Sequence, residues 1–444
     1  MRETRTAQQS IFQPRVDHEI GIELGRMSDW LDDHPELLEL VALDVRSATG
    51  HPQGRSGLSI DSILRCALLK QYRQVDYRSL AFYLRDSVSF AEFARLNDRA
   101  APGKSTLQRL TSLIHPETWE ALDRCLLDEA CAAGVESGER LRVDATVTET
   151  HILAPSDSGL LYDAVRVMVR LLKRSRDYDP AVTFNNHQRL AKRRRHAIMN
   201  ARTNARRRPL YEELLKVTQR TLEFLDAAYE VLEKQQDIAA WRAEVRHYRP
   251  LIQRVIEQTR RRVLLGERVA SEDKVVSLFE PHTDIIVKGA RDVQYGHKLT
   301  LSSGASGLVL DVVVETGNPA DSTCLVPMLE RHRTNYEQVP KQLAADGGYA
   351  SRANLETAKA MGVEQVAFHK RVGLTVEEMT GDRWLYRKLR NFRAGIEAVI
   401  SYLKRCFGLS RCHWKGLDHF KAYVHSAVFT HNLLVLTQRL AASG

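Results

Sequence analysis

The stretch at residues 386–407, YRKLRNFRAGIEAVISYLKRCF, places the strongest constraint on the fold of this chain. At about 100° per residue its large apolar side chains fall on one side, which is typical of an amphipathic helix packed on a core. These side chains are Leu389, Phe392, Ile396, Val399, Leu403 and Phe407. We therefore predict a long helix with one buried face near the C-terminal end.

A polar stripe flanks this apolar face. Steps of three, four and seven residues return to nearly the same angle on a helix, so five polar side chains line up along it. They are Tyr386, Arg390, Arg393, Glu397 and Lys404. A row of cations suits a polyanion, and a carboxylate within that row makes chemical sense if a divalent metal ion lies between the two. The alternative is that Glu397 forms i, i+4 salt bridges on a solvated helix.

Length and charge limit the class of protein. A chain of 444 residues exceeds one typical core, so we expect two or three domains. The net charge of +9 favours nucleic acid as the partner, with a membrane surface as the alternative. The opening MRETRTAQQS lacks the apolar region of a signal peptide, and no apolar run approaches the length of a membrane span. Six cysteines without CxxC spacing indicate reduced thiols, so we expect a cytoplasmic protein.

Residues 1–138 have the pattern of short helices. We predict helices at residues 58–70, 77–84, 89–96, 106–114 and 116–133. Ser59 is a candidate N-cap, and Ser105 with Gln108 fits a capping box. The cations on these helices are Arg65, Lys70, Arg73, Arg78 and Arg85. They indicate either a helix-turn-helix that docks on DNA or a solvated helical surface, and the pattern alone does not separate the two.

A strand pattern begins at Leu141. The residues LRVDATVTE alternate apolar and polar side chains and are rich in β-branched types. Asp144 interrupts the apolar side of this strand. A buried carboxylate is costly without a partner, so Asp144 needs a cation or hydrogen-bond donors. The alternative is an edge strand on which Asp144 faces water.

A basic helical segment follows at about residues 158–270. Residues 166–208 carry 14 Lys or Arg and 2 Asp, a surplus of 12 positive charges. The cluster KRRR, which is Lys192, Arg193, Arg194 and Arg195, is typical of a surface that neutralises phosphates, although a charge run can also be a solvated face. Pro209 and Pro250 are predicted to break helices, which leaves a helical hairpin at residues 212–263 divided at Pro250.

The pattern then alternates between strand and helix. Strands are predicted at residues 284–288, 298–301, 308–315, 342–345 and 364–370, and helices at residues 322–334 and 352–361. This order indicates an α/β fold with a mixed sheet flanked by helices. Asp346 would then lie at the carboxyl end of a central strand, where such sheets bind ligands, and Gly347 and Gly348 would permit close approach. The alternative is a tight turn with a capping aspartate.

Three blocks of sequence resemble one family. DATV at Asp144, ADGGY at Asp346, and the spacing of Arg393, Glu397 and Lys404 are similar to the three blocks of the DDE transposases of bacterial insertion sequences. Residues 65–87, RCALLKQYRQVDYRSLAFYLRDS, also resemble the amino-terminal domain of that group. Arg390 stands where the family signature has tyrosine, and Ala145 stands where serine or glycine is commoner.

The resemblance implies a fold and a site. It implies a ribonuclease-H-like catalytic domain at residues 139–444, interrupted by the basic helical insertion at about 158–270, after an all-helical N-terminal domain at residues 1–138 that binds DNA ends. It implies that Asp144, Asp346 and Glu397 are catalytic and hold two divalent ions, Mg²⁺ or Mn²⁺. DNA contacts are then expected from Arg393, Lys404, Arg390, Lys298 and Tyr349, with salt bridging or packing as the alternative.

The resemblance also implies an activity. We expect a DNA transposase that binds the terminal inverted repeats of an insertion sequence, cuts the strands and joins them to target DNA. Its partners would be double-stranded DNA and further copies of the chain, as a homodimer or larger synaptic assembly at the bacterial nucleoid. The alternatives are a metal-dependent nuclease of the same fold and a non-catalytic DNA-binding derivative of a transposase.

Overall fold

The chain folds into two compact units. The computed structural model describes residues 4, 17–49, 57–96, 100–233, 235, 237–287, 293–370 and 372–443. Unit 1 comprises Met1–Glu149 and His297–Gly444, and unit 2 comprises Thr150–Gly296. Within the described residues, no helix combines the length and the apolar character that crossing a membrane requires.

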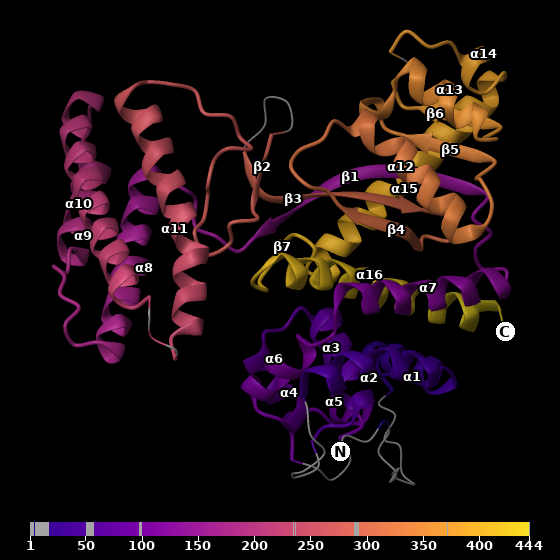
Figure 1. Cartoon of the computed structure of the whole chain (residues 1–444). Coiled ribbons are helices and arrows are strands. Elements are labelled where there is room, and N and C mark those ends of the chain that lie inside the picture. The colour runs from indigo at the N-terminus through magenta and orange to yellow at the C-terminus, as the bar shows by residue number, and fades with distance from the viewer. Residues whose placement is uncertain are drawn as a thin grey trace. The chain divides into compact units, whose positions relative to one another are not determined.

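Short helices form the N-terminal part of unit 1 (Figure 1). They are α1 (Glu19–Asp33), α2 (Glu36–Thr49), α3 (Ile60–Arg73), α4 (Tyr77–Asp86), α5 (Val88–Phe93) and α6 (Lys104–Thr111). The predicted N-cap Ser59 is confirmed, because its hydroxyl accepts the Ser62 N–H at 3.2 Å. The capping box at Ser105 is wrong: α6 begins at Lys104, two residues earlier than predicted, and Ser105 lies inside its first turn.

Two cations of this helical part are buried. Arg65 is 0% exposed, and its guanidinium donates to Asp61 at 2.5 Å and to Asp32 at 3.0 Å. Lys70 is 9% exposed. A buried charge needs compensating groups, and Arg65 finds them in these two carboxylates inside the fold. The solvated alternative is therefore wrong for Arg65 and Lys70, whereas DNA docking by this helical part stays a prediction.

A mixed sheet forms the centre of the C-terminal part of unit 1. Its strands run in the order β3-β1-β5-β6, with β4 paired to β3 and β7 paired to β1. β1 is parallel to β5, β5 is parallel to β6, and β3 is antiparallel to β4. The strands are β1 (Arg140–Thr150), β3 (Gln294–Ser303), β4 (Val309–Val314), β5 (Gln342–Ala345), β6 (Gln365–Phe368) and β7 (Arg411–Cys412). The order is consistent with a ribonuclease-H-like core.

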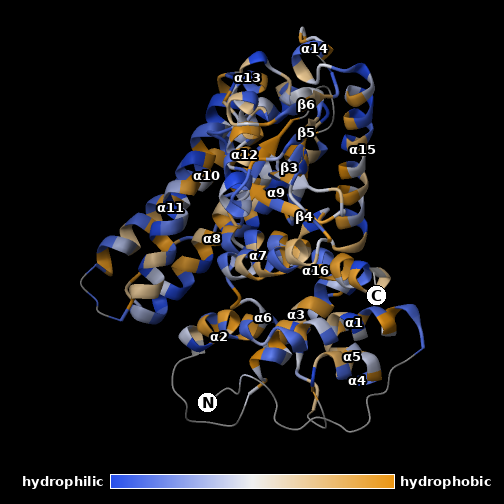
Figure 2. Cartoon of the chain, turned by 90° about the vertical axis from the view of Figure 1, so that its right-hand side faces the viewer, coloured by the Kyte–Doolittle hydropathy of each residue, from blue (hydrophilic) through white to orange (hydrophobic). Residues whose placement is uncertain are grey.

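Helices lie on both sides of this sheet, as predicted. Figure 2 shows β5 and β6 between two helices on one side, α12 (Asp321–Tyr336) and α13 (Arg352–Ala360), and one on the other, α15 (Arg383–Cys406). A short α14 (Val376–Met379) precedes α15. Two further helices, α7 (Pro116–Ala132) and α16 (Leu417–Ser443), lie side by side (Figure 1). The Asn432 amide donates to Asp123 and to the Val309 carbonyl, which joins α16 to α7 and β4.

The predicted amphipathic helix is confirmed as α15. Its apolar side is buried, with Leu389, Ile396 and Leu403 at 0% exposure. α15 crosses β1 where Gly395 faces Arg142, because a Cβ on this glycine would collide with the guanidinium. Arg142 donates to the Ser303 hydroxyl at 2.7 Å and to the Phe392 carbonyl at 3.1 Å. One strand side chain thus fixes α15 against the sheet.

Unit 2 is mainly helical. It contains α8 (Asp157–Tyr178), α9 (Gln188–Asn200), α10 (Asn204–Val231), α11 (Ala239–Thr259), a π-helical turn (Arg260–Leu264) and β2 (Asp284–Ile286), which pairs with Gln294, Tyr295 and Gly296. Its core centres on Trp241, which is 0% exposed and donates from Nε1 to the Leu171 carbonyl at 2.9 Å. This indole joins α11 to α8.

The predicted helix breaks at the two prolines are wrong. Pro209 lies inside α10 and Pro250 lies inside α11. Pro209 is the sixth residue of α10, so it removes one backbone hydrogen bond near the beginning of a helix of 28 residues. Pro250 stands between buried Val245 and Ile252, so packing on both of its sides outweighs one missing hydrogen bond.

Replacing Gly395 by alanine tests the contact between α15 and β1. Gly395→Ala should lower the thermal unfolding midpoint, since overpacking at the Arg142 guanidinium costs about 1–3 kcal/mol. Gly25→Ala in α1 is the matched control, because a Cβ there meets nothing within 4 Å and should raise the midpoint through helix propensity. Differential scanning fluorimetry of both variants measures this, and an equal rise in both would exclude the tight contact.

Candidate active site

Asp144 lies in the middle of β1. Its side chain is 19% exposed, and its Oδ1 accepts the Ala145 N–H at 2.7 Å. β1 has β3 on one side and β5 on the other, so this stretch is not an edge of the sheet. The edge-strand alternative for Asp144 is therefore wrong, and the carboxylate has the partners that the sequence demanded.

Asp346 follows β5 directly and begins a 3₁₀ turn over Gly347–Tyr349. Val143 pairs with Ala345 in the parallel register of β1 and β5, so the next residues, Asp144 and Asp346, lie at the same level of the sheet. The close approach expected at the glycines occurs at Gly348, where a Cβ would lie 2.5 Å from Asp321 Oδ2. The loop after β5 thus needs glycine for packing.

Glu397 lies on α15, and its side chain is 61% exposed. Two contacts set the position of this helix relative to the strand ends. The Tyr386 hydroxyl donates to the carbonyl of Phe368, at the end of β6, at 2.9 Å. Arg142 binds the Phe392 carbonyl one turn before Glu397. The helix therefore brings Glu397 to the level of the two aspartates.

Arg393 joins all three carboxylates. Its Nη1 lies 3.5 Å from Asp144 Oδ2 and 3.3 Å from Asp346 Oδ1, and its Nη2 contacts Glu397 Oε1. Arg393 is 7% exposed. The i, i+4 salt bridge considered for Glu397 is thus present, and the same guanidinium also holds both aspartates. We call Asp144, Asp346, Glu397 and Arg393 the carboxylate cluster.

The charge of the carboxylate cluster is unbalanced. The Arg393 guanidinium carries one positive charge and contacts three carboxylates, so it does not neutralise them by itself, which favours a further cation. Carboxylate oxygens are ligands that suit Mg²⁺ and Mn²⁺, so the donor set fits a hard divalent ion. Among the described residues no group of His, Cys, Asp and Glu is itself arranged to hold a metal ion. Arg393 lies between the donors instead.

The other cations predicted on this stripe differ in exposure. Arg390 is exposed, and Lys404 is partly exposed. Lys298 is 2% exposed, donates to the Pro319 carbonyl at 2.7 Å and pairs with Asp321. Tyr349 is 0% exposed, and burial raises its pKa. Lys298 and Tyr349 thus have internal positions, and DNA contact by either one stays a prediction.

Arg142 is a residue that the sequence analysis missed. It lies two positions before Asp144 on β1, so both side chains are on the same face of the strand. That spacing was a usable signal, because a strand arginine beside a strand aspartate needs a partner of its own. Its partners are the backbone of α15 and Ser303.

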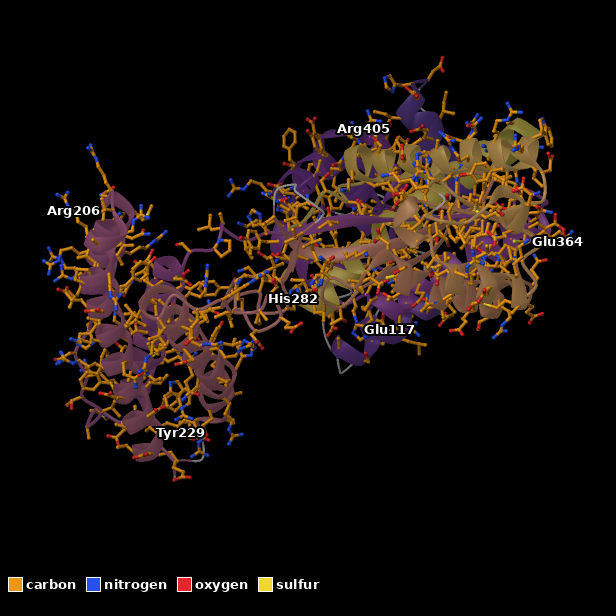
Figure 3. The ribbon with its side chains drawn as sticks, turned by 90° about the horizontal axis from the view of Figure 1, so that it is seen from above. Glu117, Arg206, Tyr229, His282, Glu364 and Arg405 are labelled. Atoms are coloured by element: carbon orange, nitrogen blue, oxygen red, sulfur yellow. The ribbon has the colours of Figure 1, made fainter. Side chains whose placement is uncertain are left out.

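The basic cluster of unit 2 is divided between exposed and paired side chains. Lys192 and Arg193 are exposed on α9. Arg194 pairs with Glu213, and the Arg195 guanidinium lies 5.5 Å from the centroid of the Tyr162 ring. Figure 3 shows Arg206, at the start of α10, among nitrogen-tipped side chains that extend from the ribbon. Phosphate binding by this cluster stays a prediction.

Comparison with known proteins gives one result. Residues 288–433 match the family model of the transposase DDE domain. Asp346, Glu397 and Lys404 lie inside this match, whereas Asp144 and most of unit 2 precede it. Neither the curated proteins nor the solved structures include a match to the chain. This part of the chain is therefore similar to the DDE domain of transposases, the family that the motifs of the chain resembled.

Proposed function

We propose that this protein is a DNA transposase that binds the terminal inverted repeats of an insertion sequence, cleaves the strands at its ends and joins them to target DNA. The observation that carries this proposal is the convergence of Asp144, Asp346 and Glu397 on Arg393. The three carboxylates come from a strand, a strand end and a helix that are distant in the sequence. A protein that only binds DNA gains nothing from carboxylates gathered beside phosphates.

Asp144, Asp346 and Glu397 are proposed as the residues that hold Mg²⁺ or Mn²⁺. When bound, such ions activate a water or hydroxyl nucleophile and stabilise the leaving oxygen of a phosphodiester. Arg393 neutralises part of the carboxylate charge and fixes the orientation of the three side chains. Arg390 and Lys404 lie on the same polar stripe of α15, where they would bind phosphates on either side of the scissile bond.

DNA binding is assigned to surfaces outside the carboxylate cluster. The short N-terminal helices and the exposed cations of unit 2 would contact the element ends through phosphates. Because two ends must be held for joining, we propose that the active form is a homodimer or a larger synaptic assembly at the bacterial nucleoid.

A strand-transfer assay tests the proposed reaction. Labelled element ends are incubated with Mg²⁺ or Mn²⁺ and wild type, Asp144→Asn, Asp346→Asn or Glu397→Gln. The wild type should give joined products, and each variant should give neither cleavage nor joining while still binding DNA, because it loses one metal ligand. Gel shift measures the binding.

Three outcomes would contradict parts of this assignment. Cleavage without joining in the wild type would favour a nuclease of the same fold. DNA binding without either reaction would favour a non-catalytic derivative. Loss of DNA binding in proportion to loss of cleavage would remove Asp144, Asp346 and Glu397 from the metal site.

Replacing Arg393 tests its role as the shared cation of the carboxylate cluster. Arg393→Gln should lower the thermal midpoint without metal by the equivalent of about 2 kcal/mol, less than a fully buried pair since Glu397 is 61% exposed. Mn²⁺ should then raise the midpoint more than in wild type. Arg390→Gln, exposed and one turn earlier, is the matched control and should behave as wild type. If Mn²⁺ raises the thermal midpoint equally in Arg393→Gln and wild type, Arg393 is not the shared cation of the three carboxylates.

Salt dependence tests the basic surface of unit 2. The double variant Lys192→Gln/Arg193→Gln should flatten the slope of log K against log salt by about 1.8, since each neutralised phosphate contributes about 0.9. Arg170→Gln/Arg174→Gln is the control, because both arginines pair with Glu244 and have less charge to offer. Fluorescence anisotropy between low and moderate salt measures both slopes. An unchanged slope for the first variant would assign Lys192 and Arg193 to a solvated face.

A further inference from the structure

A cavity lies in unit 1, apart from the carboxylate cluster. Its volume is about 600 Å³, within the range of about 300–1,000 Å³ typical of small-molecule sites. The C-terminal end of α3, the start of α4, α6 and the segment between β7 and α16 contribute its walls. Its lining includes Lys70, Gln74, Tyr77, Gln108, Trp414 and Lys415. We call it the Lys70 cavity.

Lys70 is a buried cation held by aromatic rings. Its Nζ lies 5.1 Å from the ring centroid of Tyr77, 5.4 Å from that of Trp414 and 5.8 Å from that of Tyr423. Among the described residues no carboxylate lies within ion-pair distance of this amine. Burial lowers the pKa of Lys70 to about 8, although the nearby Cys412 and the Asp76 carboxylate act in the opposite direction. Ring faces attract the ammonium but do not neutralise it, so an anion in the cavity would complete its environment.

Trp414 has a buried indole N–H without a hydrogen-bond partner among the described residues. The partly exposed indole lines the cavity and packs edge-on against Tyr423, with ring centroids 5.7 Å apart. An indole face is a stacking surface for any nucleobase, and it needs no particular base edge.

The remaining walls combine positive charge with amide groups. Lys415 is exposed at the cavity, and His413 and His419 also line it. Gln108 supplies an amide, which both donates and accepts hydrogen bonds and so suits a base edge, whereas the Gln74 amide nitrogen already donates to the Arg405 carbonyl. Asp76 also lines the cavity, and its Oδ1 accepts the Ser79 N–H at 2.7 Å at the start of α4. The cavity therefore offers a cation, an aromatic face and an amide together.

We propose that the Lys70 cavity binds a nucleotide, with its phosphate at Lys70 and Lys415 and its base against the indole of Trp414. The nucleotide has two possible sources, a free nucleotide or an unpaired nucleotide of a DNA strand. The second source rests on the proposed DNA transposase function, and the first does not. A duplex with every base paired offers phosphates but no free base face, so it does not fill this cavity.

Calorimetric titration of the full chain tests this site. The probes are 2′-deoxyadenosine 5′-monophosphate, inorganic phosphate, a blunt duplex and the same duplex with a single-stranded overhang. A chelator in the buffer keeps the carboxylate cluster out of the measurement. The nucleotide should bind more tightly than phosphate, and Lys70→Met should weaken it at least about ten-fold, which is about 1.4 kcal/mol. Trp414→Leu should remove the preference for nucleotide over phosphate.

Controls separate this site from general charge. Arg73→Gln, exposed near the end of α3 and outside the cavity lining, should bind the nucleotide as wild type does. If Lys70→Met does not fold, Lys415→Gln at the exposed rim replaces it and should weaken binding several-fold. Glu397→Gln should bind the nucleotide normally, so failure of the proposed strand transfer would leave this result intact.

The outcomes decide both the site and the source. Tighter binding of the overhang than of the blunt duplex, lost in Lys70→Met, assigns the cavity to a DNA strand. Nucleotide binding without an overhang preference assigns it to a free nucleotide. Equal affinity for nucleotide and phosphate, or nucleotide affinity unchanged in Lys70→Met, would overturn the proposal.

Discussion

The interaction of Arg393 with three carboxylates is the constraint on which the candidate site depends. A nearly buried guanidinium is costly to desolvate unless its N–H groups meet acceptors, and here the acceptors come from β1, the end of β5 and the next turn of α15. Arg393 reaches all three carboxylates only if α15 packs at the correct position along the sheet. Tyr386 sets that position at the end of β6, and Arg142 sets it at β1. These two hydrogen bonds therefore determine the distance between Asp144 and Arg393, which are 249 residues apart in the sequence.

The elements of this site were predictable because their signals are local. The 3.6-residue period of the apolar side chains predicted α15, and alternation predicted the strand that carries Asp144. An aspartate in a central strand also required a cation. The identity of that cation was not predictable, because a helical wheel gives the angle of Arg393 but not the neighbours it meets. Arg393 was expected to face phosphates, and the fold surrounds it with carboxylates.

The basic insertion was harder to predict, because its charges have partners that are distant in the sequence. Composition gave a surplus of 12 positive charges over residues 166–208, but some of that charge is compensated within unit 2. Arg170 and Arg174 share Glu244, and Arg194 pairs with Glu213. These partners are distant in sequence, so a local count cannot find them. The two prolines were misjudged for a related reason, since burial on both sides of Pro250 comes from tertiary packing.

Arg393 and Lys70 are both nearly buried cations, yet their surroundings favour opposite ligands. Three carboxylates outnumber the charge of Arg393, so the carboxylate cluster attracts further positive charge. Lys70 faces aromatic rings, which hold an ammonium without cancelling it, so its cavity attracts negative charge. A reaction on DNA needs both kinds of site, because the phosphodiester must approach metal ligands while neighbouring nucleotides are held by cations and stacking surfaces. The different partners of these two cations thus support two proposed sites in unit 1 with distinct chemistry.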